Sequence, residues 1–363
     1  MRSIRFGIVT IMMTFLALLT GSFRRVGAQY SMPQDAATPK VTGYALKKPV
    51  FGGACPRCPW GAMGDVVKAA LKPYGWDVQM CYYCAGGPRE ARIVADAMMA
   101  APPEHPGPDT LPTPQGAVDF GATGVEFLQA AYLGKNDFAK DPQGPRKHLR
   151  MIANIQEPIY YIVAVKANSG ITDLKQIVER RLPVKMVVRS LHSRLITPAV
   201  LAYYGITEER VKSYGGTIAT SYSRDADTDV FIGFGSVANT PEYESWPAAT
   251  QKYDLHYLEL TPDLRAKLAK DFDLQEKNMP MGLFRGVERP IPTVASFGTV
   301  IYGRTDMPDE FAYTLAKAMD EHQELLVWTH MNWSYNWRTV WKALDVPLHP
   351  GAARYYKERG YMK

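Results

Sequence analysis

The chain has 363 residues, of which 46% are hydrophobic and 21% are charged, and its formal net charge is +6. These fractions are those of an ordinary globular protein, and the length suggests two domains of about 100–200 residues each. The sequence contains no run of Lys and Arg interleaved with aromatic residues, so it gives no support to nucleic-acid binding.

The first 28 residues have the layout of a secretory signal peptide. Arg2 and Arg5 precede an apolar run at residues 6–19, and small residues follow at 26–28. The apolar run is shorter than the ~20 residues that a membrane span requires. We therefore predict cleavage near residue 28, export to the periplasm, and a mature chain that does not span the membrane. Removal of the four arginines of the signal reduces the formal charge from +6 to +2.

The first half of the mature chain alternates strands, glycine turns and helices. Residues 29–48 are polar and contain proline, and we interpret them as a linker. Hydrophobic spacing then predicts strands ending near residues 52, 80 and 122 and helices at 62–71, 89–99 and 125–132. The proline-rich residues 101–116 are interpreted as a surface insertion.

The second half repeats this order. The expected strands span 160–165, 184–188, 229–233 and 299–302, and the expected helices span 175–180, 197–204 and 309–330. Repeated strand–helix units build parallel sheets, so an α/β fold with two sections is predicted. We assign residues 49–155 to the first section and 156–290 to the second, with residues 291–363 returning to the first. Four tryptophans near the end of the chain are expected in the core or between the sections: Trp328, Trp333, Trp337 and Trp341.

Loops that follow the strands are the candidate ligand site. In open α/β sheets, ligands bind at the carboxyl ends of strands, where helix N-termini favour anions. The alternative interpretation is that the glycines only permit tight turns and that the arginines are solvated. The candidate ligand-binding residues are Gly52, Gly53, Arg57, Trp60, Gly86, Gly87, Arg89, Thr123, Tyr160, Ser190, His192, Ser193, Arg194, Gly235 and Ser236.

The end of the chain contains the segment Pro347-Leu348-His349-Pro350-Gly351-Ala352-Ala353-Arg354-Tyr355-Tyr356. This segment strongly resembles the closing motif of TAXI-type solute-binding proteins, which are the receptors of one branch of TRAP transporters. Glu157-Pro158, the turn at 169–174 and Pro292-Thr293-Val294 also occur in the order of that family. The resemblance implies a two-lobed periplasmic-binding-protein fold (type II, Venus-flytrap) without catalytic residues. It also implies a small anionic or zwitterionic solute, such as an amino acid or dicarboxylate, and delivery to a TRAP-type membrane permease. Ser190–Arg194 replaces the family's glycine-containing loop, which allows a different or larger ligand.

Four cysteines form two CxxC pairs, at Cys55 and Cys58 and at Cys81 and Cys84, both in predicted ligand-side loops. Structural disulfides, including bridges between the loops, fit an exported chain. A four-cysteine zinc site and thiol redox chemistry are the alternatives. They define a second possible function, a periplasmic metal-binding or thiol-redox protein on the same fold. The sequence lacks the serine-hydrolase elbow and the zinc-protease motif, and His349 is expected to be a structural hydrogen-bonding residue.

Overall fold

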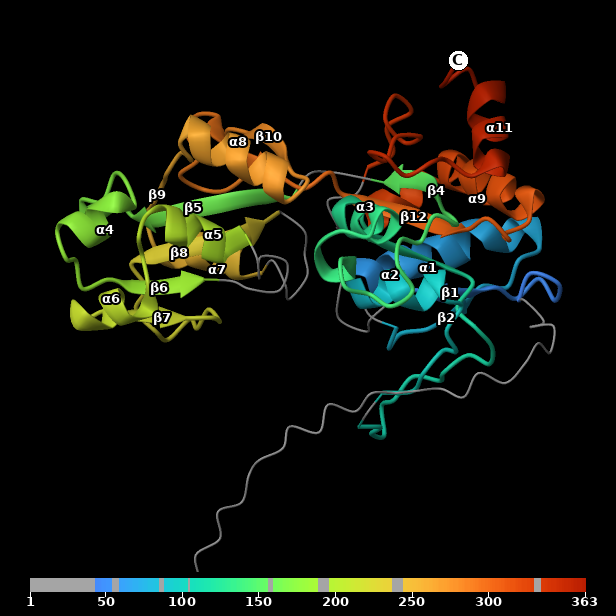
Figure 1. The fold of residues 1–363 in the computed structure, drawn as a ribbon, viewed down its shortest axis with the longest axis horizontal. Helices are drawn as coiled ribbons and strands as arrows, with labels where there is room; N and C mark the ends of the chain where they lie inside the picture. The colour runs from blue at the N-terminus through green and yellow to red at the C-terminus, as the bar shows by residue number, and fades with distance from the viewer. Residues whose placement is uncertain are drawn as a thin grey trace, which may run out of the picture. The chain divides into compact units, whose positions relative to one another are not determined.

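The computed structural model describes residues 43–53, 59–84, 88–103, 105–155, 159–188, 196–236, 244–329 and 334–363 (Figure 1). The predicted signal peptide and residues 29–42 of the predicted linker lie outside these residues. Within the described part, no helix is both long enough and apolar enough to cross a membrane. The last residues of the predicted linker are structured. Tyr44 is buried and its ring centroid lies 4.9 Å from that of Phe311, so residues 43–48 belong to the folded protein.

The first sheet has the strand order β2-β1-β3-β12-β4. Its strands are β1 (Val50–Gly52), β2 (Gln79–Met80), β3 (Phe120–Gly124), β4 (Leu149–Ile155) and β12 (Thr299–Arg304). β1 pairs in parallel with β2 and β3, whereas β12 runs antiparallel to both β3 and β4. We call this sheet and the helices packed on it the first lobe.

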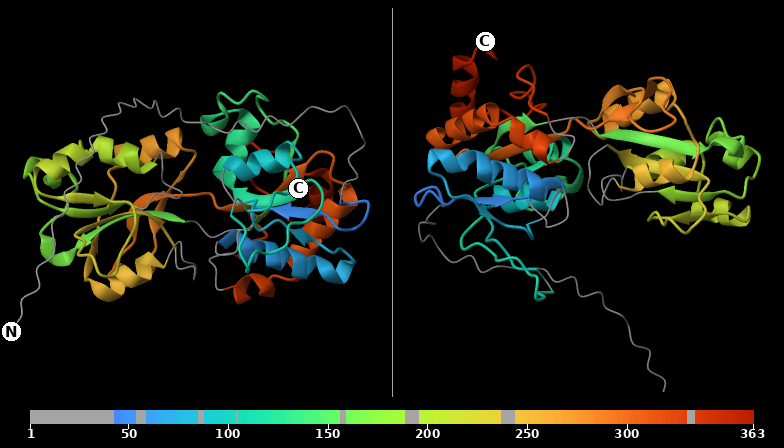
Figure 2. Two further views of the ribbon diagram at one scale, coloured as in Figure 1. Left: turned by 90° about the horizontal axis from the view of Figure 1, so that it is seen from below. Right: turned by 180° about the vertical axis from the view of Figure 1, so that it is seen from behind.

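Helices cover both faces of the first sheet because its strands are apolar on both sides (Figure 2). On one face, Phe51 and Phe120 pack with α1 (Pro59–Leu71), α9 (Asp309–Glu321) and α11 (Pro350–Glu358). On the other face, Val300 and Tyr302 pack with α2 (Pro88–Ala95) and α3 (Val125–Leu133). The alternation of side chains along each strand therefore divides the first lobe into two hydrophobic clusters.

The second sheet has seven strands in the order β10-β11-β5-β8-β6-β7, with β9 also paired to β5. Its strands are β5 (Tyr160–Lys166), β6 (Lys185–Val188), β7 (Thr217–Ala219), β8 (Val230–Gly235), β9 (Leu255–Tyr257), β10 (Gln275–Met279) and β11 (Ile291–Ala295). β6 is parallel to β7 and β8, whereas β5 is antiparallel to its neighbours. This sheet and its helices form the second lobe.

Helices also cover both faces of the second sheet (Figure 2). Tyr161 and Val163 of β5 pack with α4 (Lys175–Glu179), α5 (Ile196–Tyr203), α6 (Glu208–Ser213) and α8 (Pro262–Asp271). Ile162 and Ala164 point to the opposite face and pack with α7 (Ser245–Lys252). The two sheets, each with helices on both faces, confirm the predicted α/β fold with two sections.

The chain leaves the first sheet after β4 and returns to it with β12. β11 is paired with β10 and β5, so residues 291–295 belong to the second lobe. The return therefore falls between Ala295 and Thr299, several residues after the expected position. The charged strand β10 was absent from the predicted elements because Gln275-Glu276-Lys277 shows no hydrophobic alternation.

Two predicted helices are shorter in the structure. α2 ends at Ala95, and Ala97 adopts a left-handed φ of 46°, so the helix does not reach residue 99. The predicted helix 309–330 is divided into α9 and α10 (Glu324–Trp328). At the division, the side chain of Gln323 donates to the Asp320 carbonyl oxygen over 2.9 Å, which replaces a helical backbone bond at that carbonyl.

The closing motif forms α11 and its N-cap. His349 is buried, its Nδ1 accepts the Gly351 N–H over 3.3 Å, and its Nε2 donates to the Met307 carbonyl oxygen over 3.1 Å. Burial lowers the pKa of His349, so the neutral ring makes both contacts. The predicted structural role is confirmed. Trp328 and Trp337 are 76% and 46% exposed, so neither is a core residue, whereas Trp341 is partly buried against the cluster that contains Phe51. Trp333 lies outside the described residues. Packing of these side chains between the two sections stays a prediction.

Candidate functional site

The carboxyl ends of β1, β2 and β3 lie at one edge of the first sheet. These strands are parallel, and α1, α2 and α3 follow them in turn (Figure 1). The Gly53 N–H donates to the Cys84 carbonyl oxygen over 2.9 Å, and the Cys81 N–H donates to the Phe51 carbonyl oxygen over 2.9 Å. These bonds connect the starts of the first two loops. The first lobe therefore brings the predicted loops of this sheet to a common edge.

Steric contacts explain why the two residues at the end of β1 are glycines. Gly53 has φ of 84°, and a Cβ atom there would lie 2.3 Å from the Ala122 carbonyl oxygen. At Gly52, a Cβ atom would lie 2.8 Å from the Val118 side chain. Both positions need glycine because the backbone passes close to β3 or to Val118 just before it, whether or not a ligand binds.

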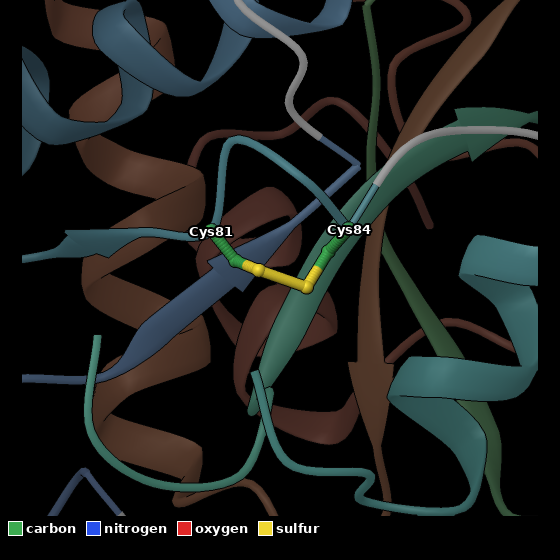
Figure 3. Close-up of a disulfide and its surroundings, with 2 residues drawn as sticks. All are labelled: Cys81 and Cys84. Atoms are coloured by element: carbon green, nitrogen blue, oxygen red, sulfur yellow. A yellow bond between two sulfur atoms is a disulfide. The ribbon is translucent and has the colours of Figure 1, made fainter. Parts of the chain in front are cut away.

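A disulfide closes the second loop. Cys81 and Cys84 are bonded, with an S–S distance of 2.02 Å, and each residue is 1% exposed (Figure 3). We had predicted disulfides between the two loops. This prediction is wrong for Cys81 and Cys84, because they are bonded to each other within one loop, three residues apart. Four cysteines permit three pairings, and the sequence offered no means to choose among them. Cys55 and Cys58 lie outside the described residues.

The disulfide turn presents two tyrosines. The Tyr82 hydroxyl donates to Asp65 Oδ1 over 3.0 Å, and burial together with Asp65 raises the pKa of Tyr82 to about 12. The Tyr83 hydroxyl accepts the Leu111 N–H over 2.8 Å. The turn thus connects α1 to the proline-rich insertion, and both hydroxyls already have protein partners.

Thr123 is the predicted ligand residue with the most informative environment. It is fully buried at the end of β3, and its Oγ1 has no hydrogen-bond partner among the described residues. Phe120 and Ala122 pack with α1 and α9, so the alternation of β3 directs Thr123 to the face that α2 and α3 cover. A buried hydroxyl without a partner costs about 1–3 kcal/mol, which a ligand atom at this edge would recover.

Glu126 is a polar residue of this edge that the sequence reasoning missed. It lies in the first turn of α3, and its Oε1 lies 2.6 Å from the position of a Cβ atom added to Gly124. Its carboxylate therefore lies back over the N-terminus of α3, where negative charge is favourable. The sequence could have indicated Glu126, because an acidic residue in the first turn of the predicted helix at 125–132 is typical of a helix N-terminus.

Three predicted residues of the second lobe lie near strand ends. Tyr160 begins β5, and Gly235 ends β8 and is its partner in the strand register. Ser236 follows directly and is buried. A Cβ atom at Gly235 would lie 2.6 Å from both Ile162 and the Trp246 ring, so this glycine is required for packing.

The remaining predicted ligand residues lie outside the described residues or in helices whose side chains there are not described. Outside the described residues lie Arg57, Gly86, Gly87, Ser190, His192, Ser193 and Arg194. Trp60 lies in α1 and Arg89 in α2, but the described structure does not include their side chains. Among the described residues, no group of three or more His, Cys, Asp or Glu side chains could hold a metal ion.

The fold and the strand-end loops define an α/β protein with two lobes, in which parallel strand ends meet at one edge of the first sheet. The model of the NMT1-like family matches residues 112–360, which is more than half of the chain. The chain belongs to the NMT1-like family.

The solved structures to which this chain is similar are distant in sequence. A TctC solute-binding protein from Polaromonas is 12% identical, with a TM-score of 0.42, and the alignment covers 86% of this chain and 96% of that chain. The binding-protein component of a Pseudomonas aeruginosa ABC phosphonate transporter is 13% identical, with a TM-score of 0.39 and coverages of 79% and 80%. A Xanthomonas citri protein bound to chloride ion is 12% identical, with a TM-score of 0.40 and coverages of 86% and 95%.

Proposed function

We propose that this protein is an extracytoplasmic receptor for a small anionic or zwitterionic organic solute, of the amino-acid or dicarboxylate type. The solute binds at the strand-end edges, is released unchanged, and passes to a TRAP-type permease. A receptor of this kind needs polar groups that replace the water around the ligand and needs no catalytic residue. The signal-like start of the chain supports a periplasmic location, and the closing motif supports the TAXI branch.

The observation that carries the proposal is the buried Thr123 hydroxyl. It lies where β3 ends, beside the loops that follow β1 and β2, and it has no partner in the described structure. A side chain that serves only the fold would satisfy its hydroxyl or be replaced by an apolar residue of the same shape. An unpartnered hydroxyl at the edge where α/β proteins bind ligands favours a binding role.

Thermal unfolding with a panel of dicarboxylates and amino acids tests the proposal. At a hundredfold excess over Kd, a true ligand stabilises the protein by about 2.7 kcal/mol. We expect at least one member of the panel to raise Tm by several degrees. If no member of the panel changes Tm, the assigned solute class is wrong.

Thr123→Val separates a binding role from a structural one. Val has the same shape without the hydroxyl, so the ligand-free variant should be as stable as the native protein or more stable, by up to about 1–3 kcal/mol. The ligand-induced rise in Tm should fall or disappear. Thr314→Val is the matched control, since the Thr314 hydroxyl donates to the Glu310 carbonyl oxygen over 2.7 Å. That variant should lose stability and keep the ligand response. Loss of stability in Thr123→Val with unchanged ligand binding would contradict the assignment.

A further inference from the structure

Positive charge is concentrated at the end of the chain. Residues 334–363 contain six Lys or Arg and two Asp or Glu, an excess of four positive charges. The predicted mature chain has a formal charge of +2, so residues 29–333 carry an excess of two negative charges. All six cations are exposed: Arg338, Lys342, Arg354, Lys357, Arg359 and Lys363. The last segment is therefore a basic surface on a protein whose remainder is slightly acidic.

Aromatic rings lie among these cations. Trp337 is 46% exposed, and its ring centroid lies 5.8 Å from that of Tyr361. The Arg338 guanidinium carbon lies 4.8 Å from the centroid of the Trp337 ring. The Arg359 guanidinium carbon lies 5.5 Å from the centroid of the Tyr361 ring. We call these four side chains the aromatic–basic cluster. The loop before α11 and the end of the chain, which supply them, lie at the same end of the first lobe (Figure 1).

The cluster has a fixed base. The Tyr361 ring stacks on the buried Tyr356 ring at 6.3 Å between centroids. The Tyr361 hydroxyl and Arg359 Nε both donate to Asp320 Oδ2, over 2.9 Å and 3.2 Å. Asp320 is only 7% exposed, so this carboxylate is covered by the groups that it holds. Side chains that are held in place lose little further freedom when they bind a surface.

The loop before α11 adds further apolar and basic side chains. Lys342 Nζ lies 4.7 Å from the centroid of the Trp341 ring, and Leu344 is 41% exposed. The two acidic residues of the segment already accept hydrogen bonds. Asp345 Oδ2 accepts the Gln129 side chain over 3.3 Å, and Glu358 Oε2 accepts the Tyr313 hydroxyl over 2.6 Å.

This combination of side chains fits a bilayer surface that contains anionic phospholipid. Trp and Tyr have an apolar body and a polar edge, and they are enriched at the level of lipid headgroups. Each Lys or Arg close to an anionic bilayer strengthens binding about fivefold. The negative excess of residues 29–333 opposes approach by the rest of the protein, so the charge distribution turns residues 334–363 toward such a surface. A soluble anion would use the cations and leave the rings in water.

We propose that the aromatic–basic cluster and the loop before α11 bind the protein peripherally to a bilayer that contains anionic phospholipid. The inference goes beyond the solute receptor function, because none of these residues belongs to the strand-end edge.

Flotation with lipid vesicles tests the proposal. The mature chain, residues 29–363, is used because the predicted signal peptide would itself bind to vesicles. We expect the protein to float with vesicles of phosphatidylglycerol and phosphatidylcholine in equal amounts. Binding to phosphatidylcholine alone should be at least about tenfold weaker. Binding to the mixed vesicles should also fall in about 1 M NaCl, where exposed charges are screened within about 3 Å.

Substitutions separate the cations from the rings. The double variant Arg338→Gln/Lys342→Gln should bind the mixed vesicles about 25-fold more weakly, about fivefold for each cation. Trp337→Ser should also weaken binding, and Trp337→Tyr should restore it. The restoring variant keeps a ring at this position, so a loss caused only by altered folding would be recognised. Both cations are exposed, and the double variant should therefore fold.

Exposed residues of the second lobe provide matched controls. Lys175 and Lys212 are 58% and 65% exposed, and Met281 is 66% exposed. Lys175→Gln/Lys212→Gln and Met281→Ser should bind the mixed vesicles as the native protein does. No flotation, equal flotation with both kinds of vesicle, an unchanged affinity in Trp337→Ser, or an equal loss in the controls would overturn the proposal.

Other occupants of this surface would give different results. Dimerisation of the native chain that Trp337→Ser abolishes would assign the surface to a second copy. Binding only to vesicles that contain membrane protein would assign it to a protein partner. Either result would overturn the proposal. Arg338→Gln/Lys342→Gln should keep the solute-induced rise in Tm, so failure of this surface and failure of the solute site can be distinguished.

Discussion

At the scale of single residues, Asp119 shows how a buried carboxylate makes stability depend on pH. Asp119 is 1% exposed, and its Oδ2 accepts the Val50 N–H over 2.8 Å. Burial raises its pKa to about 6, although the Val50 N–H and Arg304 act in the opposite direction. The group connects the start of β1 to β3, and the Tyr44 hydroxyl donates to its carbonyl oxygen over 3.3 Å.

We predict that Asp119→Asn stabilises the protein more at pH 7 than at pH 5. The folded protein holds a proton on Asp119 below about pH 6, whereas the unfolded chain holds it only below about 3.8. The folded state therefore binds more protons in this window, and the contribution of Asp119 to stability rises as pH falls. The difference between the two pH values should be on the order of 1 kcal/mol in urea unfolding. An equal effect of the substitution at both pH values would contradict the assignment.

At the scale of elements, α11 depends on one glycine of the closing motif. A Cβ atom at Gly351 would lie 2.1 Å from the Asp309 carbonyl oxygen, where α11 begins against the start of α9. Ala favours a helix over Gly by about 1 kcal/mol, but relief of the overlap must separate two packed helices. Overpacking of this kind costs about 1–3 kcal/mol.

Gly351→Ala should therefore lower the free energy of unfolding by about 1–3 kcal/mol, measured by urea denaturation. Gly107→Ala is the matched control, because a Cβ atom there has no neighbour within 4 Å. We expect its stability to stay within about 0.5 kcal/mol of the native value. A Gly351→Ala variant as stable as the control would show that α11 can move away from α9 without cost.

The elements that sequence could predict are those with a strong hydrophobic pattern. The apolar runs of β5 and β8 and the glycine turn after β1 were expected near their observed positions. β7 and β10 were not, because their exposed residues do not alternate. β4, β9 and β11 were also not among the expected strands, although most of their residues are buried. At the candidate site, the loops were expected, but the Cys81–Cys84 pairing and the place of the Glu126 carboxylate depend on tertiary geometry.

At the scale of the molecule, the two lobes share a chain but not a core. Every buried residue of the two clusters in the second lobe comes from residues 161–294. The clusters of the first lobe contain no residue of that range. The first lobe is instead assembled from two distant segments, because β12 separates β3 from β4 and is the described partner of β4.

This arrangement predicts that residues 159–296 fold alone, whereas residues 43–155 do not. The first fragment keeps all seven strands of its sheet and both clusters. The second loses β12, which leaves β4 without its partner strand. Circular dichroism and cooperative urea unfolding should distinguish the two fragments.

A joined fragment provides the matched control. Ile155 at the end of β4 is the register partner of Thr299 at the start of β12, and these strands are antiparallel. An Asn-Gly turn between residues 155 and 299 can therefore close a hairpin in place of the whole second lobe. We expect residues 43–155 joined in this way to residues 299–363 to unfold cooperatively. Folding of residues 43–155 alone would show that β4 does not need β12. Failure of both the joined fragment and residues 159–296 would show that each lobe depends on contacts with the other.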